Sequence, residues 1–533
     1  MTTLPDETSP LLPLSHGLFS SGKRYRYRRE SFETGFPLVV AEEIDVQPTL
    51  QELIPSKREP EWTAVSPSPC QWLERNCAVS FTLLMSAIGA GTLAVPYTFV
   101  LLSPFQAILM LCCVGLAMGF TADILVGIHV SVAVESTSGP QGNRETYQNL
   151  AYRAGGKALA RFTGALTAFA VFGACVGCVR VMKDMAPMML PAVIAGFKQQ
   201  PLEIQKHDAI VAVWVAGLIV VVPLGCLTKI SALRFSSYLG VAFSVYLVGA
   251  VAYRAIVTGS DDESNVLPAS VQETEAPLFW RIAEVVGIYN FTFMLHLNVI
   301  PLFAQLVADE TTRSQQVHGK DIEALGSAEA PVAVHILQRA RQSLRRHLTL
   351  AVGTCVMLYA IFGVCAAQIY GSKTQGNILL NLTNDRIMAV PRVAVLLTIL
   401  FSFPLLFHPL RSLVFEMILV CTSHSAVRNV NEGHNQDHEL SQVVRAAVSG
   451  LLLIAQILCA LHVPGIQVVF SFVGSSILLM LCYLFPLIFY VRLVPWRSSG
   501  EGKARLLLLS ALAAVAFVVC VAATLQLVVQ ETP

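Results

Sequence analysis

The sequence has few charged residues. Asp, Glu, Lys and Arg make up 13% of its 533 residues, whereas a soluble domain carries roughly 25%. Hydrophobic residues make up 54%, and the mean hydropathy is +0.61. So little polar surface excludes an ordinary soluble domain and indicates a chain that lies in a lipid bilayer. The net charge of +1 gives no reason to expect a nucleic-acid partner.

The motifs of metal and catalytic sites are missing as well. The 13 cysteines show no spacing typical of a zinc site, and most of them fall inside apolar runs, where they serve as small core- or lipid-facing residues. The sequence contains no HExxH motif, no nucleophile elbow and no clustered pair of intramembrane acids. These absences argue against a membrane-embedded enzyme, and we expect no cofactor and no bound metal.

The amino terminus also lacks the charged-then-apolar pattern of a signal peptide. Residues 1–72 are rich in Pro, Ser, Glu and Arg and have no sustained apolar period, which predicts a disordered cytosolic tail. Residues 73–530 are then expected to form one transmembrane domain.

Long apolar runs dominate this second part of the chain. A helix that crosses a bilayer needs about 20 apolar residues, and windows of that length predict an all-α integral membrane protein with eleven spans. The spans are predicted near residues 78–102, 104–130, 159–182, 208–227, 234–257, 280–306, 347–370, 391–410, 444–462, 465–491 and 504–528.

The distribution of Lys and Arg predicts the orientation. Both residues concentrate in the segments that face the cytosol if the amino terminus lies inside, which is the bias expected of membrane proteins. An odd number of spans then makes the carboxyl terminus extracytosolic. Asn381, Leu382 and Thr383 form a glycosylation sequon in a loop on the outer side, so Asn381 is the predicted glycan acceptor.

The first apolar run is interrupted in its middle. Residues 86–97 read SAIGAGTLAVPY, with Gly89 and Gly91 in the interruption and Pro96 five residues later. A spanning helix must satisfy its backbone hydrogen bonds internally, so helix-weakening residues at mid-membrane predict a break that turns free backbone groups toward a ligand. Such a break is typical of a transporter.

Several motifs resemble those of the amino acid/auxin permease family. The interruption and the following Val95, Pro96 and Tyr97 are similar to the family's first-span signature, a small-residue Gly-x-Gly followed by Leu-Pro-Tyr-like residues. In the sixth span, FTFMLHLNVIPLF is close to the family's Cys-His-x-x-Val-Leu-Pro pattern, with Leu295 in place of the Cys. Further matches, in the family's order between about residues 75 and 495, are YGSKTQGNILLNL, SFPLLFHPLR and FSFVGSSILLMLCYLFPLIFY.

The resemblance implies a fold and an activity. The fold is an inverted-repeat (LeuT/APC-like) transporter with a 5+5 arrangement of spans 1–5 and 6–10 plus one extra helix. The two most interrupted apolar segments, the first and the sixth, occupy corresponding positions of the two halves, as this fold requires. Broken helices offer backbone N–H groups to a carboxylate and carbonyls to an amine. The implied activity is secondary active transport of an amino acid by alternating access.

The substrate site is predicted at the two interruptions. Gly89, Ala90, Gly91 and Thr92 are assigned to the substrate carboxylate, because only small residues let a ligand approach backbone N–H groups closely. Ser86 lies beside them. The alternative is that this Gly-x-Gly serves close helix packing.

Thr292, Phe293 and His296 are expected to line the opposite wall. For His296, a structural hydrogen bond to a neighbouring helix is the alternative. The pocket residues are small or aromatic and uncharged, which favours neutral amino acids. Basic amino acids, GABA-like molecules and auxin-like acids are the alternative substrates.

The coupling ion is predicted from two further positions. Sodium-coupled members of the family place an Asn four residues before the first Gly of the break and a hydroxyl residue on the eighth helix, and Met85 and Ser402 stand there in this chain. A thioether is a poor ligand for a hard cation. We therefore expect coupling to H⁺, or exchange, rather than coupling to Na⁺, with His296 and Glu284 as candidate proton carriers and Ser402 as a candidate Na⁺ ligand. A boundary position near Arg281 is the alternative for Glu284.

The tail carries one motif that resembles a sorting signal. Glu7 precedes the pair Leu11 and Leu12 by four residues, similar to acidic dileucine signals that bind sorting adaptors, although so short a pattern also arises by chance. It favours an endolysosomal or vacuolar membrane, with the plasma membrane as the alternative. A membrane sensor that binds an amino acid and signals through this tail would share every feature of a carrier.

Overall fold

The computed structural model describes residues 25–26, 42–43, 79–135, 146–197, 234–261, 277–317, 329–382, 388–423 and 434–531. The chain divides into two units, of which one holds Met1–Ser31 and Leu38–Thr63 and the other holds Phe32–Pro37 and Ala64–Pro533. In the first unit, β1 (Tyr25–Arg26) and β2 (Glu42–Glu43) pair as antiparallel strands. The remainder of the predicted tail, with the sorting motif Glu7, Leu11 and Leu12, lies outside the described residues.

The described part of the second unit is helical. Its first helix spans Val79–Ala87. The longer elements that follow are α2 (Val95–Leu101), α3 (Pro104–Glu135), α4 (Tyr147–Phe197), α6 (Arg234–Asp261), α7 (Leu278–Thr292), α8 (His296–Val317), α9 (Glu329–Tyr370), α11 (Ala389–Ser423), α12 (His434–His462), α13 (Ile466–Leu478), α14 (Phe485–Leu493) and α15 (Gly500–Glu531). Shorter elements are the 3-10 helices η1 (Ala90–Ala94), η4 (Gly371–Lys373) and η7 (Trp496–Ser498), the helix α10 (Ile378–Asn381), and the π-helical turn η6 (Leu479–Leu484) between α13 and α14.

The predicted spans correspond closely to these helices. Among the described residues, nine helices are long and apolar enough to cross a membrane, and the bent pair Val79–Ala87 and Ala90–Leu101 adds a tenth. Each predicted span has its counterpart here except residues 208–227, which lie outside the described part. The multi-span, all-helical membrane architecture is therefore confirmed.

Large apolar side chains on the outside of the helices fit this architecture. Phe105, Leu116 and Leu507 are each at least 70% exposed. In water such exposure would be unfavourable, but toward lipid tails it costs nothing, because the surroundings are as apolar as the side chain. These faces therefore mark the lipid-contacting surface of the spans.

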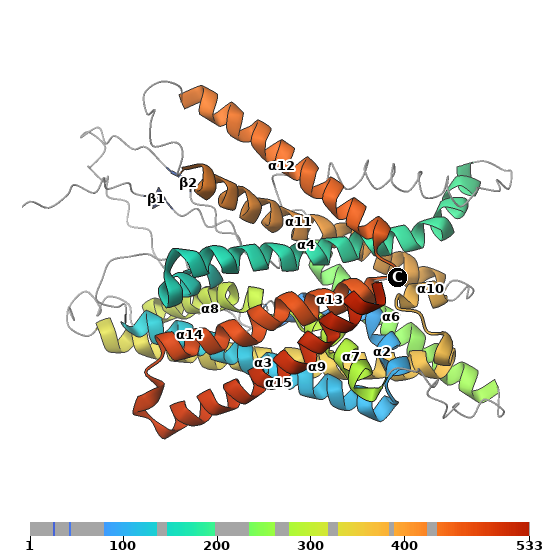
Figure 1. Cartoon of the computed structure of the whole chain (residues 1–533), viewed down its shortest axis with the longest axis horizontal. Helices are drawn as coiled ribbons and strands as arrows, with labels where there is room; N and C mark the ends of the chain where they lie inside the picture. The colour runs from blue at the N-terminus through green and yellow to red at the C-terminus, as the bar shows by residue number, and fades with distance from the viewer. Residues whose placement is uncertain are drawn as a thin grey trace, which may run out of the picture. The chain divides into compact units, whose positions relative to one another are not determined.

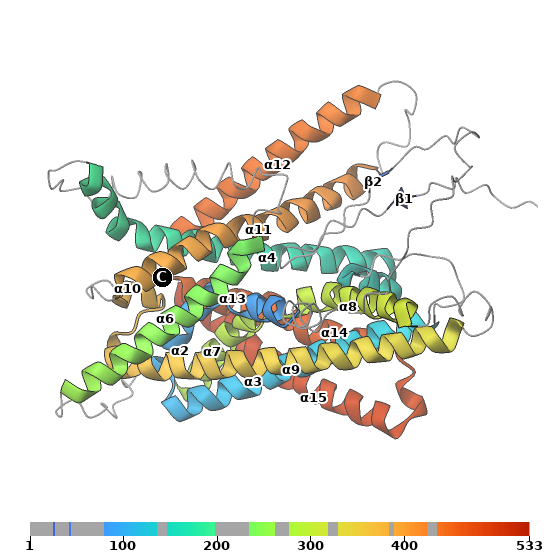
Figure 2. The same cartoon turned by 180° about the vertical axis from the view of Figure 1, so that it is seen from behind.

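The interrupted helices lie inside the bundle. In both views α8 lies between α4 on one side and α3 and α9 on the other (Figures 1 and 2). Its partner α7 packs tightly on α13, where a Cβ added to Gly474 would overlap the carbonyl of Gly287. Small residues of this kind let two backbones approach closely in a membrane, so α7 is held rigidly just before the chain breaks.

Gly156 explains where the third span begins. Its φ of 70° lies in the left-handed region, which glycine adopts without the strain that a Cβ would cause. The kink separates the start of α4 from the apolar part that follows, in agreement with the predicted span start near residue 159.

Candidate functional site

The first span is broken where the small residues predict it. The helix Val79–Ala87 stops, Ile88 and Gly89 are not helical, and the 3-10 turn η1 leads into α2 with a bend of 43°. Pro96 stands in the first turn of α2, a position that tolerates proline because no N–H is needed there. The break is thus built from weak helix formers followed by a helix start.

This break leaves backbone donors free. The first backbone bond of η1 runs from the N–H of Thr92 to the carbonyl of Gly89, at 3.1 Å. The N–H groups of Ala90 and Gly91 precede this bond and have no acceptor among the described residues. Free N–H groups at a helical amino end carry a partial positive charge and suit an anion such as a carboxylate.

The second break lies opposite the first. The helix α7 ends at Thr292, residues 293–295 are irregular, and α8 begins at His296. A Cβ added to Gly91 would lie 3.1 Å from Phe291 Cδ1 and 3.2 Å from Thr292 Oγ1. The two breaks therefore touch each other at Gly91, which fulfils the expectation that the first and sixth spans meet at one place.

A cavity of about 130 Å³ adjoins both breaks, far more than the roughly 10–15 Å³ that one water molecule needs. Its walls come from the first span, α4, α6, the α7–α8 break and α11. Its lining is Met85, Ser86, Ala87, Ile88, Gly89, Ala90, Gly91, Thr92, Leu93, Ala174, Cys178, Ser244, Leu247, Phe291, Thr292, Met294, Leu297, Asn298, Val395, Thr398, Ile399, Ser402 and Leu406. Among the described residues, none of this lining is charged, so the cavity suits a ligand without a net charge.

Most of the predicted site residues gather here. The cavity is lined by the predicted substrate residues Ser86, Gly89, Ala90, Gly91, Thr92 and Thr292 and by the predicted coupling positions Met85 and Ser402. Thr92 Oγ1 has no hydrogen bond of good geometry within the described residues. The hydroxyl of Tyr359 donates to the carbonyl of Ala87, at 2.8 Å. This bond gives a partner to a carbonyl at the end of the helix Val79–Ala87.

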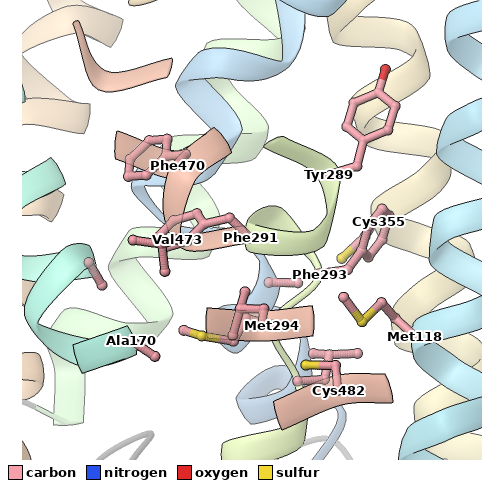
Figure 3. Packing of buried hydrophobic residues seen from close by; sticks show 14 of the residues in the cluster. Met118, Ala170, Tyr289, Phe291, Phe293, Met294, Cys355, Phe470, Val473 and Cys482 are labelled. Atoms are coloured by element: carbon pink, nitrogen blue, oxygen red, sulfur yellow. The ribbon is translucent and has the colours of Figure 1, made fainter. Parts of the chain in front are cut away.

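Phe293 and His296 were expected on the cavity wall, and the structure places them elsewhere. Phe291 stacks on Phe470, with ring centroids 4.3 Å apart (both labelled in Figure 3). Phe293 packs edge-on against Tyr359. His296 is fully buried, and its Nε2 lies 2.9 Å from Oγ1 of Thr121 on α3. The irregular residues 293–295 turn both side chains away from the cavity, and the contact with Thr121 is the structural hydrogen bond given above as the alternative for His296.

Glu284 also lies apart from the cavity lining. It is half-buried on α7, and its carboxylate makes no hydrogen bond or ion pair with the described residues. Arg281 does not neutralise it, because the guanidinium of Arg281 donates to the carbonyl of Leu101, at 3.2 Å. Tyr97 on α2 lies in its neighbourhood.

Asn298 is a cavity residue that the sequence pattern did not reveal. It is 3% exposed, and its Nδ2 donates to Ser86 Oγ at 2.6 Å. Ser244 and Thr398 are further polar lining residues of this kind. Asn298 follows His296 by two residues, but the family motif includes only the histidine. The sequence feature that could have identified Asn298 is a polar residue within an apolar run.

Two ion pairs account for other charges inside the spans. The four-residue spacing of Arg180 and Asp184 predicts a pair, and the structure has Arg180 Nε 3.2 Å from Asp184 Oδ1. Asp123 on α3 pairs with Arg341 on α9 at 3.5 Å. Pairing reduces the cost of placing these charges at membrane depth, so neither acid requires a role in binding.

The predicted glycan acceptor, Asn381, is the last residue of α10, in the segment between α9 and α11. Asn381 Oδ1 accepts from the N–H of Gln375, and Asn381 Nδ2 donates to the carbonyl of Lys373, both at 2.8 Å. Thr383 of the sequon lies outside the described residues. The other sequon-like residue, Asn290, is fully buried and is bonded by Tyr483 and Gly474, which excludes it as an acceptor in this fold.

A multi-span helical membrane protein with two interrupted helices facing one cavity is built as a solute transporter. Residues 76–316 and 335–530 match the family described as "Transmembrane amino acid transporter protein", and the chain belongs to that family. The predicted family and the amino acid transport activity are thereby confirmed, and the enzyme alternative is set aside.

Two relatives are similar over most of their length. Sodium-coupled neutral amino acid transporter 7 of Xenopus laevis is 23% identical over 406 residues, which cover 76% of this chain and 77% of the relative. Vacuolar amino acid transporter 5 of Saccharomyces cerevisiae is 21% identical over 367 residues, covering 68% and 69%. Among solved structures, a manganese transporter of Eremococcus coleocola superposes over 91% of this chain and 99% of its own, at 12% identity and a TM-score of 0.39. That score is too low to support an argument about the fold.

Proposed function

We propose that the protein performs secondary active transport of neutral amino acids by alternating access around the cavity between the two breaks. The observation that carries this proposal is an uncharged cavity that meets the free N–H groups of Ala90 and Gly91. The carboxylate of the substrate binds these donors, and an uncharged wall accommodates a side chain without net charge. The word "neutral" in the name of the Xenopus laevis relative supports the same substrate class.

The proposed architecture has eleven spans. The predicted fourth span, near residues 208–227, lies outside the described residues. In this proposal spans 1–5 and 6–10 are inverted repeats, and the last span is α15. The breaks in the first and sixth spans, which touch at Gly91, support this symmetry because the repeats bring corresponding helices together at the midplane. The amino terminus is cytosolic.

Proton coupling is part of the proposal, with Glu284 as the carrier. The Glu284 carboxylate has no partner among the described residues, and a charged carboxylate at membrane depth is energetically unfavourable. Uptake of a proton removes the charge and lowers this cost. His296 is the weaker candidate, because its Nε2 is bound to Thr121 and it is not among the cavity-lining residues.

Sodium coupling is the second candidate, and two observations favour it. Ser402 and Thr398 bring hydroxyl oxygens to the cavity wall beside the first break, and the Xenopus laevis relative is named as sodium-coupled. Met85 argues against it, since a thioether stands where an oxygen ligand is needed.

The proposed location is an endolysosomal or vacuolar membrane, with the plasma membrane as the alternative. The vacuolar name of the yeast relative and the dileucine-like motif of Glu7, Leu11 and Leu12 support it. A sensor that binds the amino acid without moving it would share the cavity, and flux alone separates the two.

The test is uptake into proteoliposomes that contain the purified chain. Labelled alanine, glutamine, leucine, arginine, glutamate, GABA and indole acetate are offered under imposed pH and sodium gradients. We expect neutral amino acids to accumulate when choline replaces sodium, and more so with an inward proton gradient. Strict sodium dependence at constant pH would contradict proton coupling, and accumulation of charged substrates alone would contradict the neutral substrate class.

A further inference from the structure

Asn298, which lines the cavity, has an unused hydrogen-bond acceptor. It is the third residue of α8, it is 3% exposed, and it lines the cavity beside the first break. Its Nδ2 is bound to Ser86 Oγ, whereas its Oδ1 is buried and has no hydrogen-bond partner among the described residues. A buried carbonyl oxygen without a donor is unfavourable unless a ligand or water supplies one.

The orientation of this amide follows from the hydrogen-bond network. The two ends of an Asn side chain are alike in shape, so their assignment depends on the partners. Ser86 has a single hydroxyl hydrogen, which it donates to the carbonyl of Thr82, at 2.9 Å. Ser86 Oγ must therefore accept from Asn298, and only Nδ2 can donate. Asn298 Oδ1 is left as the free end.

Two threonine hydroxyls of the cavity wall differ from this oxygen, because each already donates its hydrogen to a backbone carbonyl. Thr292 donates to the carbonyl of Ile288 at 2.8 Å, and Thr398 donates to that of Ala394 at 3.0 Å. Asn298 Oδ1 is a carbonyl oxygen that accepts and never donates. Because the described lining contains no acidic side chain, a cationic group in the cavity has to be met by neutral oxygens of this kind.

We propose that Asn298 is a specificity-determining residue whose Oδ1 accepts a hydrogen bond from the ammonium group of the substrate, and that Ser86 is the positioning residue that orients it. The inference rests on the proposed function, in which the carboxylate binds the N–H groups of Ala90 and Gly91. It assigns the two charged ends of the amino acid to opposite sides of the cavity. Carboxylates without an ammonium group, such as auxin-like acids, are then discriminated against.

The test compares substitutions of buried amides by leucine. Asn298→Leu removes the acceptor at nearly constant volume. Gln456→Leu is the matched control, because Gln456 on α12 is also fully buried, its amide atoms also lack partners among the described residues, and it does not line the cavity. Ser86→Ala removes the group that orients Asn298, and Ser86→Thr restores a hydroxyl there.

Uptake of labelled alanine gives KM and Vmax, and inhibition by unlabelled propionate reports on a ligand with the carboxylate alone. We expect Asn298→Leu to raise the KM for alanine about 10- to 100-fold, as for loss of a hydrogen bond to a charged group, with propionate inhibition unchanged. Ser86→Ala should raise the KM less than Asn298→Leu and leave Vmax unchanged, and Ser86→Thr should have a lower KM than Ser86→Ala. Gln456→Leu should retain the wild-type KM.

Three outcomes would overturn the assignment. These are a KM in Asn298→Leu within twofold of that in Gln456→Leu, an equal loss of alanine and propionate recognition, and a wild-type KM in Ser86→Ala. If Asn298→Leu does not elute as a monodisperse protein, the Ser86 pair decides, since Asn298 remains in place there. Absence of uptake of any amino acid by the wild-type chain would instead contradict the proposed function itself.

Discussion

At the scale of single residues, the two glycines of the first break have different surroundings. A Cβ at Gly91 would press on Phe291 and Thr292, but a Cβ at Gly89 would meet nothing within 4 Å. The alternative of close helix packing therefore applies to Gly91 and not to Gly89. Both residues line the cavity, so Gly89 is the position at which a ligand role can be tested without disturbing the fold.

Gly91→Leu should abolish transport while membrane insertion stays intact, because its side chain would press on Phe291 and Thr292 where the two breaks meet. Gly89→Leu should lower the uptake of neutral amino acids by about 10-fold or more, equivalent to about 1.4 kcal/mol, without lowering the melting temperature in detergent. Uptake in proteoliposomes and thermal unfolding of the same preparations measure both. Normal uptake in either variant would contradict the assignment of the break to the substrate.

Glu284→Gln should remove the pH dependence of uptake. In the wild type, a falling pH on the outer side protonates the carboxylate and makes it neutral, so uptake should rise. Glutamine resembles the protonated form at every pH, so uptake should become independent of pH while the KM changes little. The measurement is the initial rate between pH 5 and 8, and a pH profile identical to that of the wild type would contradict the role of Glu284.

His296→Ala should act mainly on stability. The substitution removes a fully buried ring and the bond to Thr121, which together cost about 2–5 kcal/mol in comparable sites. The proton-carrier alternative for His296 predicts instead a flattened pH profile in a protein of normal stability. Thermal unfolding and the pH profile of the same variant therefore decide between the two roles.

At the scale of the elements, a basic cluster on α4 ties two other elements together. Arg180 donates to the carbonyls of Ala460 and Pro464, and Lys183 donates to that of Leu461, at the carboxyl end of α12. Positive groups are favourable at a helix carboxyl end. Asp184 completes the cluster through Arg180 and through Asn377 in the loop after α9.

Arg180→Gln should lower stability by about 1.5–3 kcal/mol, because two carbonyls and a carboxylate lose a charged partner. Arg161→Gln is the control on the same helix, since Arg161 is exposed and bonds only within α4 among the described residues. Melting temperatures in detergent compare the two variants. Equal melting temperatures would show that the cluster contributes nothing to the association of α4 with α12.

The positions of the spans could be predicted from the sequence, whereas the directions of side chains at the breaks could not. Hydropathy sums over 20 residues, so it tolerates local irregularity and located every described span. The directions of Phe293, His296 and Asn298 depend on where α7 stops and in which register α8 restarts, and three irregular residues decide this. Helical periodicity gives no information across such a gap, so Asn298 was missed and Phe293 was expected on the wrong side.

At the scale of the whole molecule, the predicted orientation makes Asn381 the glycan acceptor. Asn381→Gln would disturb the loop, because both ends of this side chain are bonded to neighbouring residues. Thr383→Ala removes the sequon and leaves Asn381 in place, so both variants should lose the same glycosidase-sensitive shift on a gel. A shift that survives in both variants would contradict an outer location of this loop, and an amino-terminal tag accessible from outside would establish the inverted topology.

The central claim is that the cavity carries an amino acid across the membrane and does not merely hold it. The most direct measurement determines, in one proteoliposome preparation, both the binding of a labelled neutral amino acid and its accumulation under an inward proton gradient without sodium. The account predicts accumulation in the lumen above the outer concentration, reduced in Gly89→Leu together with binding. Binding that saturates without any accumulation would contradict it and identify a sensor.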